Sequence, residues 1–252
     1  MSDIVHGDWE NNKKVIICKE ENKVIKLYKN APYDDIAESA RIQQFLFDSG
    51  LPVPAVYGVR KISETETALE MAYIESKPFT YDGIGKDEQI NALTVMAKLQ
   101  SMIYAVDASG FPRLADYFAK EIKSTPYLTA QIKEKAVDLL YSLDAGKTNL
   151  CHGDFHPGNI IYDGEKHWVI DWEEPSRGDP AADACMTYFY ERRFGGEESA
   201  EIYLRLICGE AEIKREDVLA WLPVIAAYQV NINDDEQRKF ILDVISECFS
   251  SR

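Results

Sequence analysis

The segment LCHGDFHPGNIIYDGEKHWVIDWEEPSRGDP, residues 150–180, holds the densest group of chemically active side chains in the sequence. Asp154 and Asn159 stand five residues apart, and the Pro-Gly pair between them imposes an irregular loop. Asp171 follows the apolar run WVI, where an expected strand ends. The pattern is open to three interpretations: a phosphoryl-transfer site, a metal-binding hydrolase site or a polar loop between two strands.

Phosphoryl transfer requires positioning and neutralisation of charge more than covalent chemistry from the protein. A carboxylate accepts the proton of the attacking hydroxyl, and oxygen ligands hold Mg²⁺ against the phosphates. Asp154 and Asn159 have the D-x-x-x-x-N spacing of a kinase catalytic loop. Asp171, seventeen residues after Asp154, stands where a second metal-binding carboxylate belongs in that arrangement. The segment therefore favours phosphoryl transfer.

Upstream of this segment, residues 1–75 are typical of a small α+β region. Two β-rich runs around a polar break predict a hairpin over residues 14–29. A helix is expected from about residue 34 until Gly50 and Pro52 end it. Further strands are expected at 55–62 and 67–74. This first domain is expected to be mainly antiparallel β and to close near residue 75.

Residues 76–252 are typical of a larger, mainly helical domain. Apolar residues near helical spacing predict helices over residues 87–106, 114–123 and 128–143. Two strands are expected around the turn GEK, at 159–163 and 167–172, and two or three helices then complete the chain. The expected fold class is therefore α+β, with a β-rich N-terminal domain and a helical C-terminal domain.

The composition excludes several classes of partner. The 252 residues carry 28 Lys and Arg against 43 Asp and Glu, which gives a net charge of −15. Such a charge repels nucleic acid and anionic membranes, and the longest apolar stretch, LAWLPVIAAY, is too short to span a bilayer. The five scattered cysteines and a first segment unlike a signal peptide predict a cytoplasmic protein.

The motifs HGDFHPGNII (152–161) and VIDWEEPSRGDPAAD (169–183) resemble the signature of the aminoglycoside phosphotransferase and choline kinase-like family. Upstream, VIKLYK (24–29), the stretch from Ile36 to Gly58 and LEMAYIESKPF (69–79) resemble further elements of that family. The resemblance implies a two-lobed protein-kinase-like fold, with residues 1–75 as the nucleotide-binding lobe and 76–252 as the catalytic and substrate-binding lobe.

The resemblance also implies roles in a reaction that uses ATP and Mg²⁺. Asp154 is the implied catalytic base, and Asn159 and Asp171 are the implied magnesium ligands. Lys26 is expected to contact the nucleotide phosphates and to pair with Glu38. The strand that meets adenine is expected to contribute its backbone around three residues: Met71, Tyr73 and Ile74.

Other residues of the motif have implied structural roles. His152 is expected to brace the loop, while Asp179 and Asp183 are expected to cap the next helix and to fix the loop. The chain also departs from the family pattern, because Gly7 is the one glycine in the segment where the phosphate loop is expected. Ala72 replaces a frequent acidic residue, and Gly153 replaces the arginine of protein kinases.

Two alternatives remain beside a small-molecule kinase. The poor glycine loop is consistent with a non-catalytic nucleotide-binding regulatory protein that keeps the kinase fold. A metal-dependent hydrolase with His152 and His156 is a distant third, because the HPGN turn breaks the helix that would bring both rings to one face. For the kinase, residues 76–252 carry 19 basic and 30 acidic side chains, which favours a cationic hydroxyl acceptor such as an aminoglycoside or amino alcohol.

Overall fold

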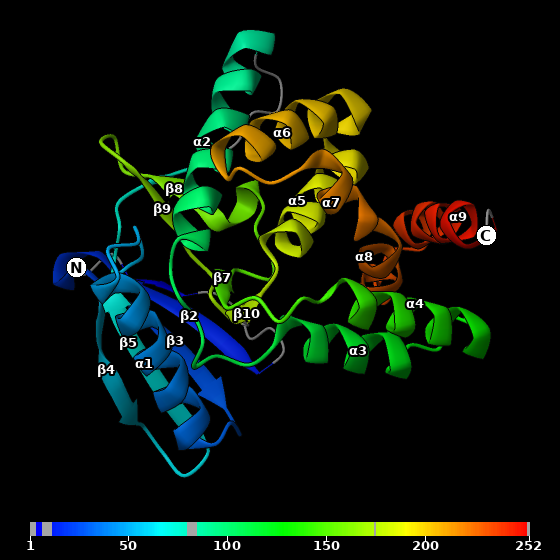
Figure 1. Ribbon diagram of the computed structural model, residues 1–252. Coiled ribbons are helices and arrows are strands. Elements are labelled where there is room, and N and C mark those ends of the chain that lie inside the picture. The colour runs from blue at the N-terminus through cyan, green and yellow to red at the C-terminus, as the bar shows by residue number, and fades with distance from the viewer. Residues whose placement is uncertain (1–3, 7–11, 80–84, 174, 251–252) are drawn as a thin grey trace. The chain divides into compact units, whose positions relative to one another are not determined.

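The computed structural model describes residues 4–6, 12–79, 85–173 and 175–250 (Figure 1). These residues form two compact units. The first unit contains the described residues up to Phe79 together with Gly158–Glu173, and the second contains the other described residues up to Pro157 and from Pro175 onward. Each unit is built from its own elements and has its own core.

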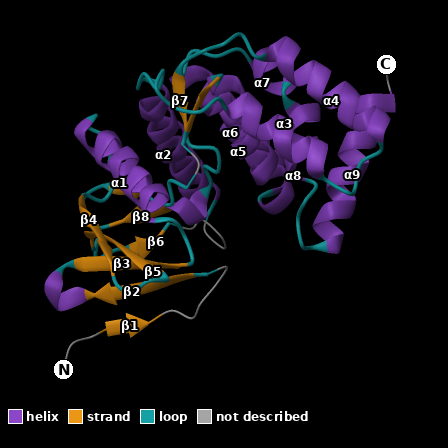
Figure 2. Cartoon of the chain, turned by 90° about the horizontal axis from the view of Figure 1, so that it is seen from below, coloured by secondary structure: helices purple, strands orange, loops and turns teal. Residues whose placement is uncertain are grey.

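The first unit is organised around an antiparallel sheet of five strands in the order β1-β2-β3-β5-β4 (Figure 2). β2 and β3 are joined by a 3₁₀ turn at Lys19–Glu21, which is followed by Asn22 in the left-handed region at φ 51°. The strands of the unit are β1 (Ile4–His6), β2 (Lys13–Cys18), β3 (Lys23–Lys29), β4 (Val56–Lys61), β5 (Glu66–Ala72), β6 (Lys77–Pro78), β8 (Ile160–Tyr162) and β9 (His167–Val169).

Helix α1 (Tyr33–Asp48) covers one face of this sheet (Figure 1). Ile36 and Ala40 lie one helical turn apart and are buried against Leu69 and Met71 of β5. The helix ends before Gly50, whose φ of 83° is a conformation that glycine adopts without a Cβ clash. The expected hairpin, helix and strands of the N-terminal region are therefore present, within one or two residues of the expected bounds.

A second, three-stranded sheet belongs to the first unit, although the division expected at residue 75 places all three of its strands in the C-terminal domain. β6 pairs with β8, and β8 pairs with β9, so that Pro78 lies opposite Ile161. The Val169 N–H also donates to the Pro52 carbonyl over 2.8 Å. These hydrogen bonds explain why residues 158–173 group with the first unit, whereas the division expected at residue 75 placed them in the second.

The second unit is helical apart from a short strand pair, β7 with β10. Figure 2 shows its helices in purple. Its elements are α2 (Lys86–Tyr104), α3 (Leu114–Ser124), α4 (Ala130–Leu143), β7 (Asn149–Cys151), β10 (Ser176–Gly178), α5 (Pro180–Phe194), α6 (Gly196–Glu210), α7 (Arg215–Ala220), α8 (Leu222–Gln229) and α9 (Asp235–Ser250). A further 3₁₀ turn, η2 (Pro157–Asn159), spans the boundary between the units.

Helix α5 forms the centre of this unit, because nearly all of its residues from Pro180 to Phe189 are buried. It packs against α6, α7, α8 and β7. Five helices therefore follow residue 179 in the described chain, more than the two or three expected. No helix of the described residues is long and apolar enough to cross a membrane.

Candidate functional site

An ion pair in the first unit brings together two of the expected site residues. Lys26 lies on β3, and its Nζ is 3.1 Å from Oδ1 of Asp171, which follows β9. The two side chains are 24% and 43% exposed, so both are accessible to a ligand. A lysine and a carboxylate 145 residues apart are therefore adjacent, as binding of a metal–phosphate complex requires.

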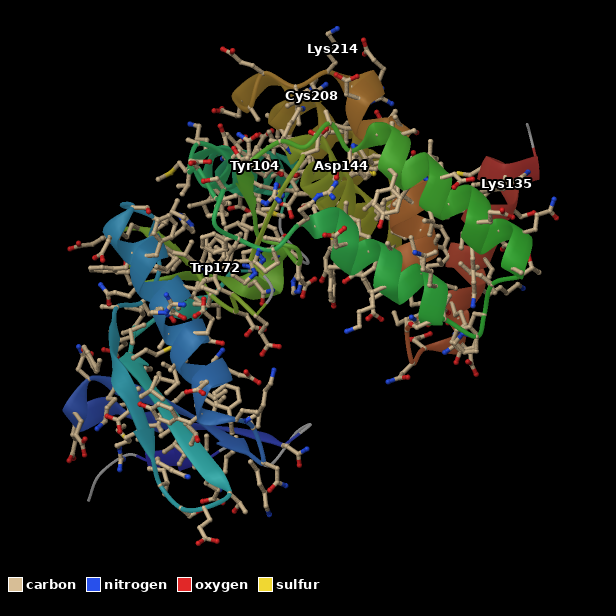
Figure 3. All side chains as sticks on the ribbon, turned by 60° about the horizontal axis from the view of Figure 1, so that its bottom comes forward. Tyr104, Lys135, Asp144, Trp172, Cys208 and Lys214 are labelled. Atoms are coloured by element: carbon tan, nitrogen blue, oxygen red, sulfur yellow. The ribbon has the colours of Figure 1, made fainter. Side chains whose placement is uncertain are left out.

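The backbone of Asp171 has a φ of 64°, in the left-handed region that non-glycine residues adopt rarely. The neighbouring Trp172 (Figure 3) is buried and donates its indole N–H to the Val169 carbonyl over 3.2 Å. Trp172 thereby holds the chain as it leaves β9. Unusual backbone conformations of this kind persist where surrounding packing imposes them, and they are concentrated at functional sites.

Asn159 lies at the same end of the β8–β9 hairpin as Asp171. Ile160 is opposite Val169 in this hairpin, and the Ile170 N–H donates to the Asn159 carbonyl over 2.9 Å. Asn159 is 7% exposed and is therefore fixed in position. An amide oxygen and a carboxylate are the types of hard-oxygen donor that could hold Mg²⁺, because that ion keeps water and phosphate oxygens as its other ligands.

Asp154 occupies a loop of the second unit and is the most exposed of the expected site residues for which the structure gives a side-chain exposure, at 68%. Its N–H donates to Nδ1 of the buried His152 over 3.3 Å. Its Oδ2 lies 3.5 Å from Nε2 of His156, whose ring stacks on Tyr190 at 4.7 Å between centroids. The Asp154 carboxylate is therefore exposed to solvent, while the Asp154 N–H is held by its hydrogen bond to the buried His152.

A buried polar network fixes the backbone on both sides of Asp154. The Gly153 N–H donates to Oδ1 of Asp183 over 2.8 Å, and the Thr187 hydroxyl donates to the Phe155 carbonyl over 2.8 Å. Gln100 on α2 donates to both helix α5 side chains, over 3.0 Å to Asp183 and 3.1 Å to Thr187. Because Gln100, Asp183 and Thr187 are all buried, the network specifies one conformation of the loop.

Two buried tyrosines accompany this network. The Tyr203 hydroxyl of α6 donates to the Gln100 amide oxygen. Tyr104 (Figure 3), the last residue of α2, is also buried. Burial raises the pKa of both hydroxyls well above the ordinary value, and the Asp183 charge adds to the effect. Both tyrosines are therefore neutral, and Tyr203 is the one for which a hydrogen bond to this network is observed in the described residues.

The structural roles expected of Asp179 and Asp183 are both observed. Asp179 is the N-cap of α5, where its Oδ1 accepts from the Ala181 N–H over 2.9 Å and from Lys147 over 2.8 Å. Asp183 fixes the loop at Gly153, as described above. Sequence analysis missed Gln100 and Thr187, although a glutamine within the apolar stripe of a helix is a detectable signal.

The expected ion pair between Lys26 and Glu38 is not present among the described residues. Glu38 is on the exposed side of α1 and pairs with Arg41, three residues further along the helix. The buried side of α1 is occupied by Ile36 and Ala40, which lie roughly opposite Glu38 on the helical wheel. Lys26 instead pairs with Asp171.

The three residues expected near adenine lie at the end of β5 and just beyond it. The Met71 side chain is in the core beneath α1, with its sulfur 3.7 Å from the Gln43 amide nitrogen. The Tyr73 N–H donates to the Asn22 carbonyl over 3.1 Å. Ile74 follows, with its side chain half-buried. Gly7, the expected remnant of a phosphate loop, lies outside the described residues.

The geometry can now be compared with known proteins. A family model described as "Phosphotransferase enzyme family" matches residues 4–219. The chain belongs to the phosphotransferase enzyme family. Among curated proteins, this phosphotransferase-family chain is 26% identical over 212 residues to acyl-CoA dehydrogenase family member 10 of Mus musculus. That similarity covers 69% of this chain and 20% of the relative, so the chain spans about a fifth of the length of that protein.

Solved structures of phosphotransferases share the fold. A thermostable mutant of aminoglycoside phosphotransferase APH(4)-Ia, in ternary complex with ADP and hygromycin B, has a TM-score of 0.71 at 16% identity, over 99% of this chain and 94% of that chain. The GDP and kanamycin complex of APH(2")-IIia has a TM-score of 0.64 at 14% identity, over 100% of this chain and 95% of that chain. A choline/ethanolamine kinase family protein from Mesorhizobium loti has a TM-score of 0.65 at 15% identity, over 99% of this chain and 88% of that chain.

At these identities the structures establish the fold of the family member and not its substrate. The expected fold class, a kinase-like α+β fold with an antiparallel β N-terminal part and a helical remainder, is confirmed. The described residues contain no group of three or more His, Cys, Asp or Glu side chains that could hold a metal ion. The hydrolase alternative therefore has no ligand set in the described part of the chain.

Proposed function

We propose that this family member transfers the γ-phosphoryl group of ATP to a hydroxyl of a small molecule. The observation that carries the proposal is the convergence of Lys26, Asp171 and Asn159 in one compact unit. A cation, a carboxylate and an amide oxygen are the groups that bind a nucleotide phosphate and Mg²⁺. Asn159 and Asp171 lie at one end of the β8–β9 hairpin and Lys26 lies on β3, where it contacts Asp171, so the three residues could act on one ligand.

Asp154 is the proposed catalytic base. The carboxylate orients the acceptor hydroxyl through a hydrogen bond and takes its proton as the bond to phosphorus forms. The hydrogen bonds at Gly153 and Phe155 hold the loop backbone on either side, so that little reorganisation is needed during the reaction. The high exposure of Asp154 leaves it accessible to the acceptor.

Asn159 and Asp171 are the residues that would hold Mg²⁺. When bound, the ion neutralises charge that develops on the phosphate oxygens. Lys26 contributes a second positive charge toward the phosphates through its ammonium group. Ile74, which follows the end of β5, offers backbone groups for adenine, because the Tyr73 N–H is already bonded to Asn22.

The acceptor is proposed to be a cationic alcohol, such as an amino sugar or amino alcohol. Two observations support this class: the acidic composition of the chain and the hygromycin B and kanamycin bound in structures of the same fold. The choline/ethanolamine kinase family protein extends the same class toward smaller amino alcohols. Sugars and nucleosides without an amino group serve as the contrasting set in the test.

The test is an acceptor screen that follows ADP release from ATP and Mg²⁺ in the presence of aminoglycosides, amino alcohols, neutral sugars and nucleosides. We expect one cationic class to stimulate ADP release and Asp154→Asn to reduce that turnover by about 10²–10⁴-fold. Full turnover in the Asp154→Asn variant would overturn the assignment of the base. ATP binding without transfer to any acceptor would instead support the non-catalytic regulatory alternative.

A further inference from the structure

A second lysine of the first unit lies beside the proposed metal–phosphate site. Lys13, on β2, forms an ion pair with Oε1 of Glu173, two residues after Asp171. The two side chains are 41% and 45% exposed. An ion pair this exposed contributes little to stability, because water already solvates both charges well. Lys13 can therefore exchange Glu173 for another anion at low cost.

The register of the sheet places Lys13 and Lys26 on the same face. Lys13 is opposite Tyr28 and Val15 is opposite Lys26 in the antiparallel pairing of β2 with β3. Side chains directly opposite each other in such a pair share a face, and alternate residues of a strand do so too. The two lysines are thus diagonal neighbours on the face that also carries Tyr28.

Tyr28 connects the two ion pairs. Nζ of Lys13 lies 6.0 Å from the centroid of the Tyr28 ring. Burial raises the pKa of the Tyr28 hydroxyl to about 12, the positive charge of Lys13 opposes this rise, and the carboxylates of Glu173 and Asp171 add to it. Lys13, Glu173 and Asp171 therefore act on a common hydroxyl and belong to one electrostatic cluster.

Nucleotide phosphates need several hydrogen-bond donors, and the N-terminal part of this sequence has few glycines that could form a phosphate-binding loop. Kinases surround the phosphates with backbone N–H groups of a glycine-rich loop. In this chain Gly7 is the one glycine among the first 49 residues. A lysine ammonium carries three donors on a flexible stem and can satisfy phosphate oxygens without a glycine backbone.

We infer that Lys13 is a second phosphate-binding cation of this site and that Glu173 is the anion with which a bound nucleotide competes for it. The inference rests on the proposed function, since it assumes that Lys26 and Asp171 bind the phosphates. Lys13 supplies a positive charge where backbone amides would otherwise act. Glu173 holds the ammonium next to Asp171 when phosphate is not bound.

Lys14 provides a matched control for the test. It has the same charge and is the next residue on β2, but it is opposite Leu27, so its side chain belongs to the other face of the sheet. The measurement is the Kd of the full chain for ATP with Mg²⁺, and for adenosine, by calorimetry. We expect Lys13→Met to weaken ATP binding about tenfold and to leave adenosine binding unchanged. Lys14→Met should change neither value.

A second variant tests the role of Glu173. Glu173→Gln removes the competing charge while leaving Lys13 in place, so ATP should bind several-fold more tightly. Equal effects of Lys13→Met and Lys14→Met on ATP, or weaker adenosine binding in Lys13→Met, would overturn the inference. If Lys26→Met abolishes ATP binding while Lys13→Met does not alter it, the inference alone fails. If the unmodified protein does not bind ATP, the proposed function fails and the inference fails with it.

Discussion

The backbone of Asp171 adopts a left-handed conformation that is unfavourable in free energy. A left-handed conformation costs a residue with a Cβ about 1–2 kcal/mol, although Asn and Asp tolerate it better than other residues. Its exposed ion pair with Lys26 returns at most about 1 kcal/mol. The conformation is therefore not retained for stability, which agrees with a role in binding the metal and phosphates.

Two substitutions at Asp171 separate the charge from the backbone conformation. Asp171→Asn should lower turnover by about 100-fold or more because the carboxylate ligand is lost, yet it should retain the free energy of unfolding. Asp171→Ala should lose turnover equally and also unfold about 1 kcal/mol more easily, because alanine tolerates the left-handed region poorly. Urea unfolding and initial rates measure both effects. Equal stability of the two variants would contradict the argument about the backbone.

Sequence reasoning at this scale named two residues that the structure brings together, and it was wrong about one partner. The H-G-D-x-x-x-x-N and I-D-W-E motifs pointed to Asn159 and Asp171, and the structure brings Asp171 together with Lys26. The partner of Glu38 could not be predicted, because Arg41 competes for it at i+3 and the choice depends on which side of α1 faces the sheet. The role of each site residue stays a prediction.

Helix α5 connects the fold to the chemistry at the scale of elements. Asp183 and Thr187 lie one turn apart on it, and both hold the loop that carries Asp154. Sequence analysis expected a helix after Asp179 but predicted no end for it, because its apolar residues lie on nearly all sides and show no amphipathic period. The short helices α7 and α8 were equally hard to predict. Amphipathic α3 and α4, by contrast, were predicted within two residues.

The Thr187 hydroxyl provides a test of this connection. Thr187→Val keeps the shape of the side chain but removes the hydroxyl donor of the Phe155 carbonyl and one of the acceptors of the Gln100 amide, so the unfolding free energy should fall by about 1–3 kcal/mol. Turnover should also fall, while the Kd for ATP changes less than about twofold, since the phosphate-binding residues lie in the other unit.

Thr94 is the matched control, because its hydroxyl bonds to the Ile90 carbonyl of its own helix. Thr94→Val should change neither turnover nor the unfolding free energy by more than about 0.5 kcal/mol. A loss of ATP affinity in Thr187→Val comparable to its loss of turnover would show that the network does more than position the loop.

At the scale of the whole molecule, the residues proposed to bind Mg²⁺ and the phosphates come from distant parts of the chain. Lys26 comes from the first sheet, whereas Asn159 and Asp171 come from a hairpin more than 100 residues later, and both belong to the same compact unit. The sequence analysis placed this hairpin and its partner strand β6 with the helical domain, because no local pattern reveals that their sheet belongs to the first unit. Long-range strand pairing depends on complementary edges, and these edges are too short to be recognised in the sequence.

This organisation predicts a specific pattern of hydrogen exchange. Binding of ATP with Mg²⁺ should slow amide exchange in β3 and in residues 159–173 together, because both segments contribute to one phosphate site. The peptides of α9 should be unaffected and serve as the internal control. Asp171→Asn should remove the protection from both segments at once, while adenosine, which lacks phosphates, should produce neither effect. Protection confined to one of the two segments would show that Lys26 and Asp171 do not bind the same ligand, and the proposed site would have to be divided.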